Sequence, residues 1–159
     1  MRHLVIAAAS AAAIGIVSTA AAQHNHSHST AREATATDNR EFVKFPAQLV
    51  EHALVNMRDH LLALQEIQEH LGMGHPDVAA RIAEARLGLS SLGTHGAHEV
   101  AKYMPKGMQD AGTAMHRAAS KFAIVATDAG VTGDMKPVFS ALASVTSACV
   151  SCHAGYRIK

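Results

Sequence analysis

The sequence has no tryptophan, and aromatic residues make up only 4% of its 159 residues. Runs of alternating apolar and polar residues are also missing, so β-strands are not indicated and an all-α fold is expected. Lysine and arginine do not cluster and the formal net charge is +1, which argues against nucleic acid or an anionic membrane as a partner. No Ser/His/Asp or paired-carboxylate pattern stands out, so we expect that the protein is not an enzyme.

Cysteine is equally scarce, and its placement is informative. The only two cysteines lie three positions apart with a histidine directly behind the second, in Cys149-Val150-Ser151-Cys152-His153. Cys-x-x-Cys-His is the attachment signature of c-type haem, in which both thiols form thioethers and the imidazole becomes an axial iron ligand. On a helix these three positions share one face. We therefore predict one covalent haem c on Cys149 and Cys152, with His153 as iron ligand.

Two alternatives to the haem are weaker. A structural zinc site usually takes four ligands, and no second cysteine pair exists. A thiol pair without haem, acting as a redox couple or metal ligand, is the other alternative, and it predicts a colourless protein.

The N-terminus indicates export. Arg2 and His3 precede an apolar run from Leu4 to Val17, and small residues up to Ala22 complete a secretory signal peptide over residues 1–22. This run is too short to span a membrane, and we expect no later span. Cleavage after Ala22 and a periplasmic location are predicted, which agrees with haem attachment after export.

Residues 23–44 are rich in His, Ser, Thr and Ala and show no apolar periodicity, so we predict a flexible segment there. His24, His26 and His28 in this segment could bind copper or zinc loosely, although adventitious or no binding is the better expectation.

The remaining residues, 45–159, have the apolar spacing of helices. Four stripes repeat at intervals of three and four residues, and glycine and proline separate them. We predict an antiparallel four-helix bundle, with a short extra helix around 97–103 in the long second connection, between Gly93 and Gly107. The stripes run from Val50 to Leu71, Val78 to Leu92, Met108 to Val125, and Val138 to Tyr156.

A four-helix bundle with one Cys-x-x-Cys-His near the end of its last helix resembles the class II c-type cytochromes, the group of cytochrome c′ and its low-spin relatives. The closing Tyr156-Arg157 pair is similar to the usual ending of that family. Arg157, four residues after His153, is expected on the same helical face, near the haem or in solvent.

The resemblance also implies what covers the second face of the iron. In low-spin relatives a methionine of the first helix binds the iron, and aligning that helix places Met57 there, on the stripe expected to be buried. A seam methionine is otherwise ordinary core filling. His60 and His116 are weaker alternatives, while Met104, Met108 and Met115 have the spacing of core residues.

These expectations define a function. With His153 and Met57 as ligands, the protein is expected to be a periplasmic one-electron carrier that meets redox proteins around the haem edge. The alternative is a five-coordinate cytochrome c′ that binds NO or CO. Relatives of this architecture are often homodimers, so the resemblance implies a homodimer.

Overall fold

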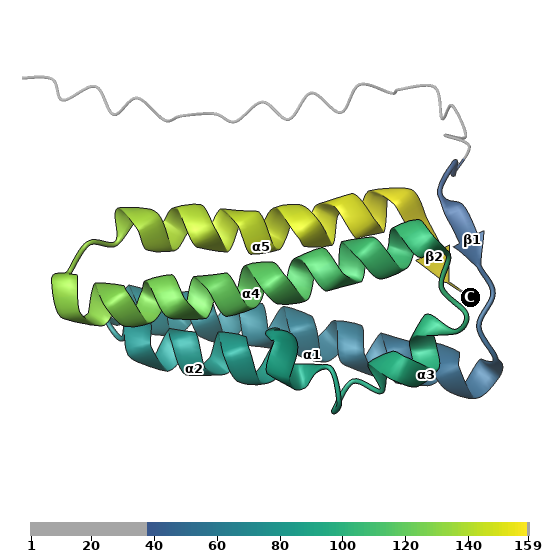
Figure 1. Ribbon diagram of the computed structural model, residues 1–159, viewed down its shortest axis with the longest axis horizontal. Helices are drawn as coiled ribbons and strands as arrows, with labels where there is room; N and C mark the ends of the chain where they lie inside the picture. The colour runs from purple at the N-terminus through teal and green to yellow at the C-terminus, as the bar shows by residue number, and fades with distance from the viewer. Residues whose placement is uncertain (1–37, 159) are drawn as a thin grey trace, which may run out of the picture. The chain divides into compact units, whose positions relative to one another are not determined.

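A computed structural model describes residues 38–158, so the predicted signal peptide and His24, His26 and His28 lie outside the described residues. The expected all-α class is confirmed, apart from one short two-stranded sheet (Figure 1). In chain order the elements are β1 (Glu41–Val43), α1 (Ala47–Gly72), α2 (Pro76–Arg86), a 3₁₀ turn η1 (Leu89–Ser91), α3 (Ala97–Ala101), α4 (Lys106–Thr132), α5 (Lys136–Gly155) and β2 (Tyr156–Ile158).

The first helix joint follows the glycine and proline signals. Gly74 adopts a φ of 76°, a left-handed conformation that glycine reaches without strain. The amide of His75 donates to the carbonyl of His70 at 2.8 Å, and Pro76 then occupies the first turn of α2, where its missing N–H costs nothing.

The second helix is shorter than predicted, because α2 ends at Arg86 rather than at Leu92. The hydroxyl of Ser90 donates to the carbonyl of Glu84 at 2.7 Å, and the amide of Ser90 donates to the carboxylate of the same residue at 3.1 Å. These bonds pair the carbonyl and the carboxylate of Glu84 with Ser90, and this pairing competes with continuation of the helix. The helix therefore ends here, and the chain continues through η1 and the short α3. Of these two elements, the sequence predicted only α3.

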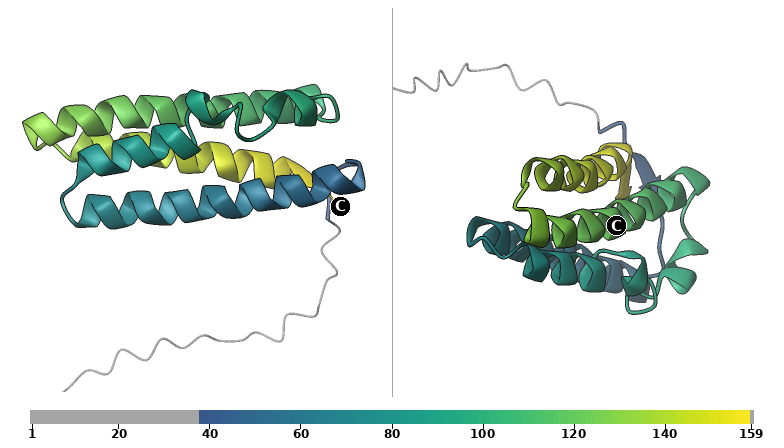
Figure 2. Two further views of the ribbon diagram at one scale, coloured as in Figure 1. Left: turned by 90° about the horizontal axis from the view of Figure 1, so that it is seen from below. Right: turned by 60° about the vertical axis from the view of Figure 1, so that its left-hand side comes forward.

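The four longer helices lie side by side (Figures 1 and 2), with α2 against both α1 and α4, and α4 against α5. One main apolar cluster joins them, and Phe122 and Val138 at its centre are fully buried. Alanines in α2 and α4 allow the helices to approach closely there. The main cluster contains Ala63, Ile67, Leu71, Ala79, Ala80, Ala83, Leu87, Met115, Ala119, Phe122, Ala123, Ala126, Ala129, Val138, Leu142 and Val145.

The two ends of the described chain meet in the small parallel sheet. β1 pairs with β2 so that Val43 lies opposite Ile158, and Val43 is 3% exposed. A second apolar cluster forms around this sheet from Val43, Phe45, Ala53 and Val100. Two expectations are therefore wrong: residues 41–44 are not part of a flexible segment, and strands are not wholly absent.

Candidate functional site

The predicted attachment residues lie in the last two turns of α5. Cys149 and Cys152 are half-buried and not joined by a disulfide, and His153 is exposed. The helix continues through Gly155, so the spacing of three and four residues does bring these side chains to one face.

Both thiols are partly removed from water. Burial raises the pKa of the Cys149 thiol, and burial followed by the neighbouring Cys149 raises the pKa of Cys152. A raised pKa keeps a thiol protonated near neutral pH, which lowers its reactivity as a nucleophile.

The end of the chain differs from the expectation. Tyr156 is extended (φ −131°, ψ 151°) and begins β2, so it is not the last residue of a helical stripe. Arg157 therefore does not share a helical face with His153. Its guanidinium lies 5.6 Å from the ring centre of Phe42 and 3.6 Å from the carboxylate of Asp38.

Met57 and Cys149 lie on helices that run in opposite directions (Figure 2). Val50 of α1 and Tyr156, which directly follows α5, both pack against the second apolar cluster. Met57 comes seven residues after Val50, and Cys149 comes seven residues before Tyr156. Counted along the chain from that cluster, the two residues are therefore the same number of positions away.

The α1 stripe that was predicted to be buried is exposed at its centre. Leu54 is 36% exposed, Met57 39% and Leu61 70%. The helix instead buries Ala53 in the second apolar cluster and Ala63, Ile67 and Leu71 in the main one. The expectation that Met57 lies on the buried seam is therefore wrong for the surface described here.

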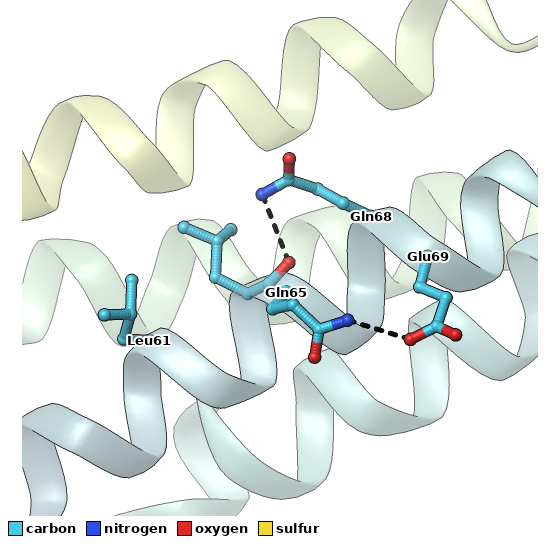
Figure 3. Close-up of a pocket in the computed structure, with 5 residues that line it drawn as sticks. Leu61, Gln65, Gln68 and Glu69 are labelled. Carbon is cyan, nitrogen blue, oxygen red and sulfur yellow. Dashed lines mark hydrogen bonds between the residues drawn. The ribbon is translucent and has the colours of Figure 1, made fainter.

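A hollow of about 460 Å³ continues this stripe on α1, one turn after Met57 (Figure 3). Leu61 and Leu64 line it together with Gln65, Gln68 and Glu69. Gln65 donates to the carboxylate of Glu69 at 2.8 Å, and Gln68 donates to the carbonyl of Leu64 at 3.2 Å. The side-chain amides of Gln65 and Gln68 are thus hydrogen-bonded within α1, and Leu61 and Leu64 form the apolar part of the hollow.

The stripe coincides with an interruption of the core. The second apolar cluster reaches along α1 only as far as Ala53, and the main cluster begins at Ala63. No side chain of residues 54–62 is buried. Cys149, the corresponding residue of α5 by the same count, packs only at the edge of the main cluster.

The competing methionines are engaged elsewhere. Met104 and Met108 pack against the second apolar cluster, and Met115 is 7% exposed within the main one. This arrangement agrees with the core spacing that the sequence predicted for them.

His60 and His116 meet in a group of three imidazoles that the sequence did not predict. The ring centres of His60 and His95 lie 4.7 Å apart, those of His95 and His116 5.8 Å, and those of His60 and His116 6.1 Å. The histidines come from α1, the loop before α3, and α4. We call them the histidine cluster. His116 is 8% exposed and His60 is half-buried, so neither ring is simply solvated.

Hydrogen bonds fix the position of the cluster. Nδ1–H of His116 donates to the carbonyl of Leu87 at 2.8 Å, and Nε2–H of His52 donates to the carbonyl of His95 at 2.8 Å. Burial, followed by the neighbouring His95 and His116, lowers the pKa of His60 to about 4, and burial lowers the pKa of His95. The imidazoles of His60 and His95 are therefore neutral at pH 7.

In their present orientations, no three His, Cys, Asp or Glu side chains within residues 38–158 are arranged to hold a metal ion. Among the described helices, α5 is long and apolar enough to cross a membrane by length and composition, which differs from the expectation of no later span. Comparison of the chain with protein-family models, curated proteins and solved structures gave no match.

Proposed function

We propose that the protein is a class II c-type cytochrome: a periplasmic electron carrier whose four-helix bundle holds one haem c near its C-terminus. Cys149 and Cys152 would carry the haem as thioethers, His153 would be the first axial iron ligand, and Met57 the second. The signal peptide of residues 1–22 would direct the chain to the periplasm.

The geometry of the cysteines supports haem attachment over a disulfide. A disulfide needs Cβ atoms about 3.5–4.5 Å apart, whereas positions three apart on a helix have Cβ atoms about 5–6 Å apart. Closing a disulfide would therefore distort the last turn of α5. Two thioethers to one flat ring need no direct contact between the sulfurs, and the half-buried Cys149 already packs against the main apolar cluster.

The observation that carries the proposal is the exposed apolar stripe of α1 around Met57, the residue that corresponds to Cys149 of α5 by position along the chain. Leu54, Met57 and Leu61 are exposed where the core is interrupted. Full burial of a leucine or methionine side chain stabilises a protein by about 1.5–3 kcal/mol. A porphyrin attached to α5 and reaching α1 would cover this stripe and join the two apolar clusters.

The two axial positions would be filled from opposite helices. A haem bound there would supply one-electron exchange between Fe(II) and Fe(III). The imidazole of His153 makes no hydrogen bond within residues 38–158 and is available as a ligand. The uncharged thioether of Met57 would favour the reduced metal, and Leu54 and Leu61, once covered by the porphyrin, would help to exclude water.

Partners would be other periplasmic redox proteins. The chain has a formal charge close to zero, so docking would depend on contacts around the haem edge rather than on a large charged patch. The homodimer implied by the resemblance remains part of this proposal.

Mass spectrometry tests attachment. The chain is expressed with a haem-attachment system, and the purified protein should carry the mass of one haem. Cys149→Ser together with Cys152→Ser should abolish the added mass, whereas Val150→Ala between them should retain it. A matured wild-type chain without the added mass would refute both the electron-carrier proposal and the gas-binding alternative.

Spin state tests the second ligand. Oxidised wild-type protein should give a low-spin EPR signal, and Met57→Ala should convert it to high spin with CO binding by the reduced form. Met73→Leu, at the distant end of α1, is the control and should remain low spin. A low-spin signal in Met57→Ala would remove Met57 as ligand, and a high-spin wild type would favour the five-coordinate, gas-binding form.

A further inference from the structure

The histidine cluster supplies no ligand to the proposed haem site, although its member on α1, His60, lies only three residues after Met57. Each of its members comes from a separate element, so the fold, and not a local motif, brings them together. We propose that His60, His95 and His116 form a binding site for a divalent transition metal such as Zn²⁺.

The spacing of the rings is close to that of metal-bound imidazoles. Zn–N bonds of about 2.0–2.1 Å in a tetrahedral site place ligand nitrogens about 3.4 Å apart and ring centres about 5 Å apart. Nε2 of His60 lies 3.4 Å from Nδ1 of His95. The three ring-centre separations, 4.7, 5.8 and 6.1 Å, are each within about 1 Å of the value for a bound metal.

The tautomer of His116 suits a ligand. Because its Nδ1–H donates to the carbonyl of Leu87, the lone pair must be on Nε2. A backbone carbonyl that holds the other ring nitrogen is the usual support of a metal-bound histidine. The rings do not yet converge on one point, so His60 and His95 must turn when the metal enters.

The charges around the cluster also favour a cation. Asp59 and Glu66 of α1 both pair with Arg86 of α2, which leaves one net negative charge beside the histidines. Three imidazoles and a water would complete a four-coordinate site, for which imidazole-rich chemistry suits zinc, copper and nickel.

The test is calorimetric titration of the matured, haem-containing protein with Zn²⁺. His24, His26 and His28 are first replaced by alanine, so that binding by the N-terminal histidines cannot contribute. This background should bind one equivalent of Zn²⁺. His60→Gln or His95→Gln should weaken binding by at least roughly tenfold, and His98→Gln, an exposed residue of α3, should not.

A second measurement does not depend on the stability of the variants. X-ray absorption at the zinc edge of the same background should show three imidazoles around the metal, and this signal is separate from that of any haem iron. Absence of Zn²⁺ binding, binding that survives both glutamine substitutions, or a coordination shell with fewer than three imidazoles would overturn the proposal. None of these results depends on the state of the haem, so the proposed electron carrier stands or falls separately.

Discussion

Acidification should destabilise the protein through His60. The pKa of this imidazole falls from its ordinary 6.5 to about 4 because burial and two neighbouring histidines disfavour its charged form. In the unfolded chain the same group would titrate near 6.5. Between these values the unfolded state binds a proton that the folded state does not, so stability falls as the pH falls from about 6.5 to about 4.

The size of the effect follows from the same two values. One pKa unit corresponds to about 1.4 kcal/mol, so the whole interval represents about 3 kcal/mol and about 2 kcal/mol is already lost at pH 5. Above pH 6.5 both states are neutral at this position, and below pH 4 both are charged. Stability lost through His60 is therefore confined to this window, and the lowered pKa of His95 adds to it in the same direction.

Urea unfolding followed by circular dichroism measures the loss. The free energy of unfolding is determined at about pH 7 and pH 5 with a metal chelator present, so that metal binding does not contribute. His60→Gln keeps a polar side chain but cannot take up the proton, and it should remove most of the pH dependence. His98→Gln removes an exposed imidazole and should leave the dependence of the wild type.

The loss of stability on acidification in each variant is compared with that of the wild type. If wild type and His60→Gln lose equal stability on acidification, the cluster is already open to water or charged, and the argument from burial is wrong. Equal flattening by both variants would likewise refute it, because an exposed histidine would then contribute as much as a buried one.

Three further predictions concern stability and use the same unfolding assay. Arg86→Met should cost about 1–2 kcal/mol, because this arginine bonds two carboxylates and a carbonyl of α1, while Arg81→Met, in an exposed pair on the same helix, should cost less than about 0.5 kcal/mol. Phe122→Ala should cost about 3–5 kcal/mol because Phe122 is fully buried, whereas Val131→Ala, at an 89% exposed position, should change stability by less than about 0.5 kcal/mol. Gly88→Ala should cost about 1–3 kcal/mol, because its Cβ would lie 2.7 Å from a backbone oxygen of the preceding turn.

The helices were predictable because their signals are local. Apolar spacing, the glycines and Pro76 between α1 and α2, and the glycine region after Thr132 all act over a few residues. The spacing predicted α1, α4 and α5 well. It failed at the end of α2, where bonds from Ser90 back to Glu84 end the helix before the apolar pattern does.

Which face of α1 is buried could not be read from spacing alone. The stripe of Leu54, Met57 and Leu61 has the larger apolar side chains, so the apolar spacing predicts that this side of α1 is buried. The structure instead buries Ala53, Ala63, Ile67 and Leu71, because α2 packs against α1 on that side along most of its length. The choice depends on the positions of other helices, which are set by contacts between residues far apart in the chain.

The sheet and the histidine cluster were missed for the same physical reason. β1 and β2 are three residues each and are stabilised by pairing between the two ends of the described chain, so neither shows a periodic pattern. His60, His95 and His116 are separated by 35 and 21 positions, and only the loop after α2 brings His95 between the other two. A buried polar residue on an otherwise apolar helix, as His116 is on α4, is the one signal that could have drawn attention to them.

The residues of the proposed haem site also differ in whether local sequence suffices to identify them. Cys149, Cys152 and His153 need only one helix to share a face, so five consecutive residues suffice to identify them. Met57 must be matched across two helices that are placed together only by the fold, and its match to Cys149 rests on Val50 and Tyr156 both packing against the second apolar cluster. A shift of one helical turn in that packing would bring Leu54 or Leu61 to the same height, and neither can bind iron. The spin state of Met57→Ala is therefore also a measurement of helix register: a change to high spin requires α1 and α5 to meet in the register described here.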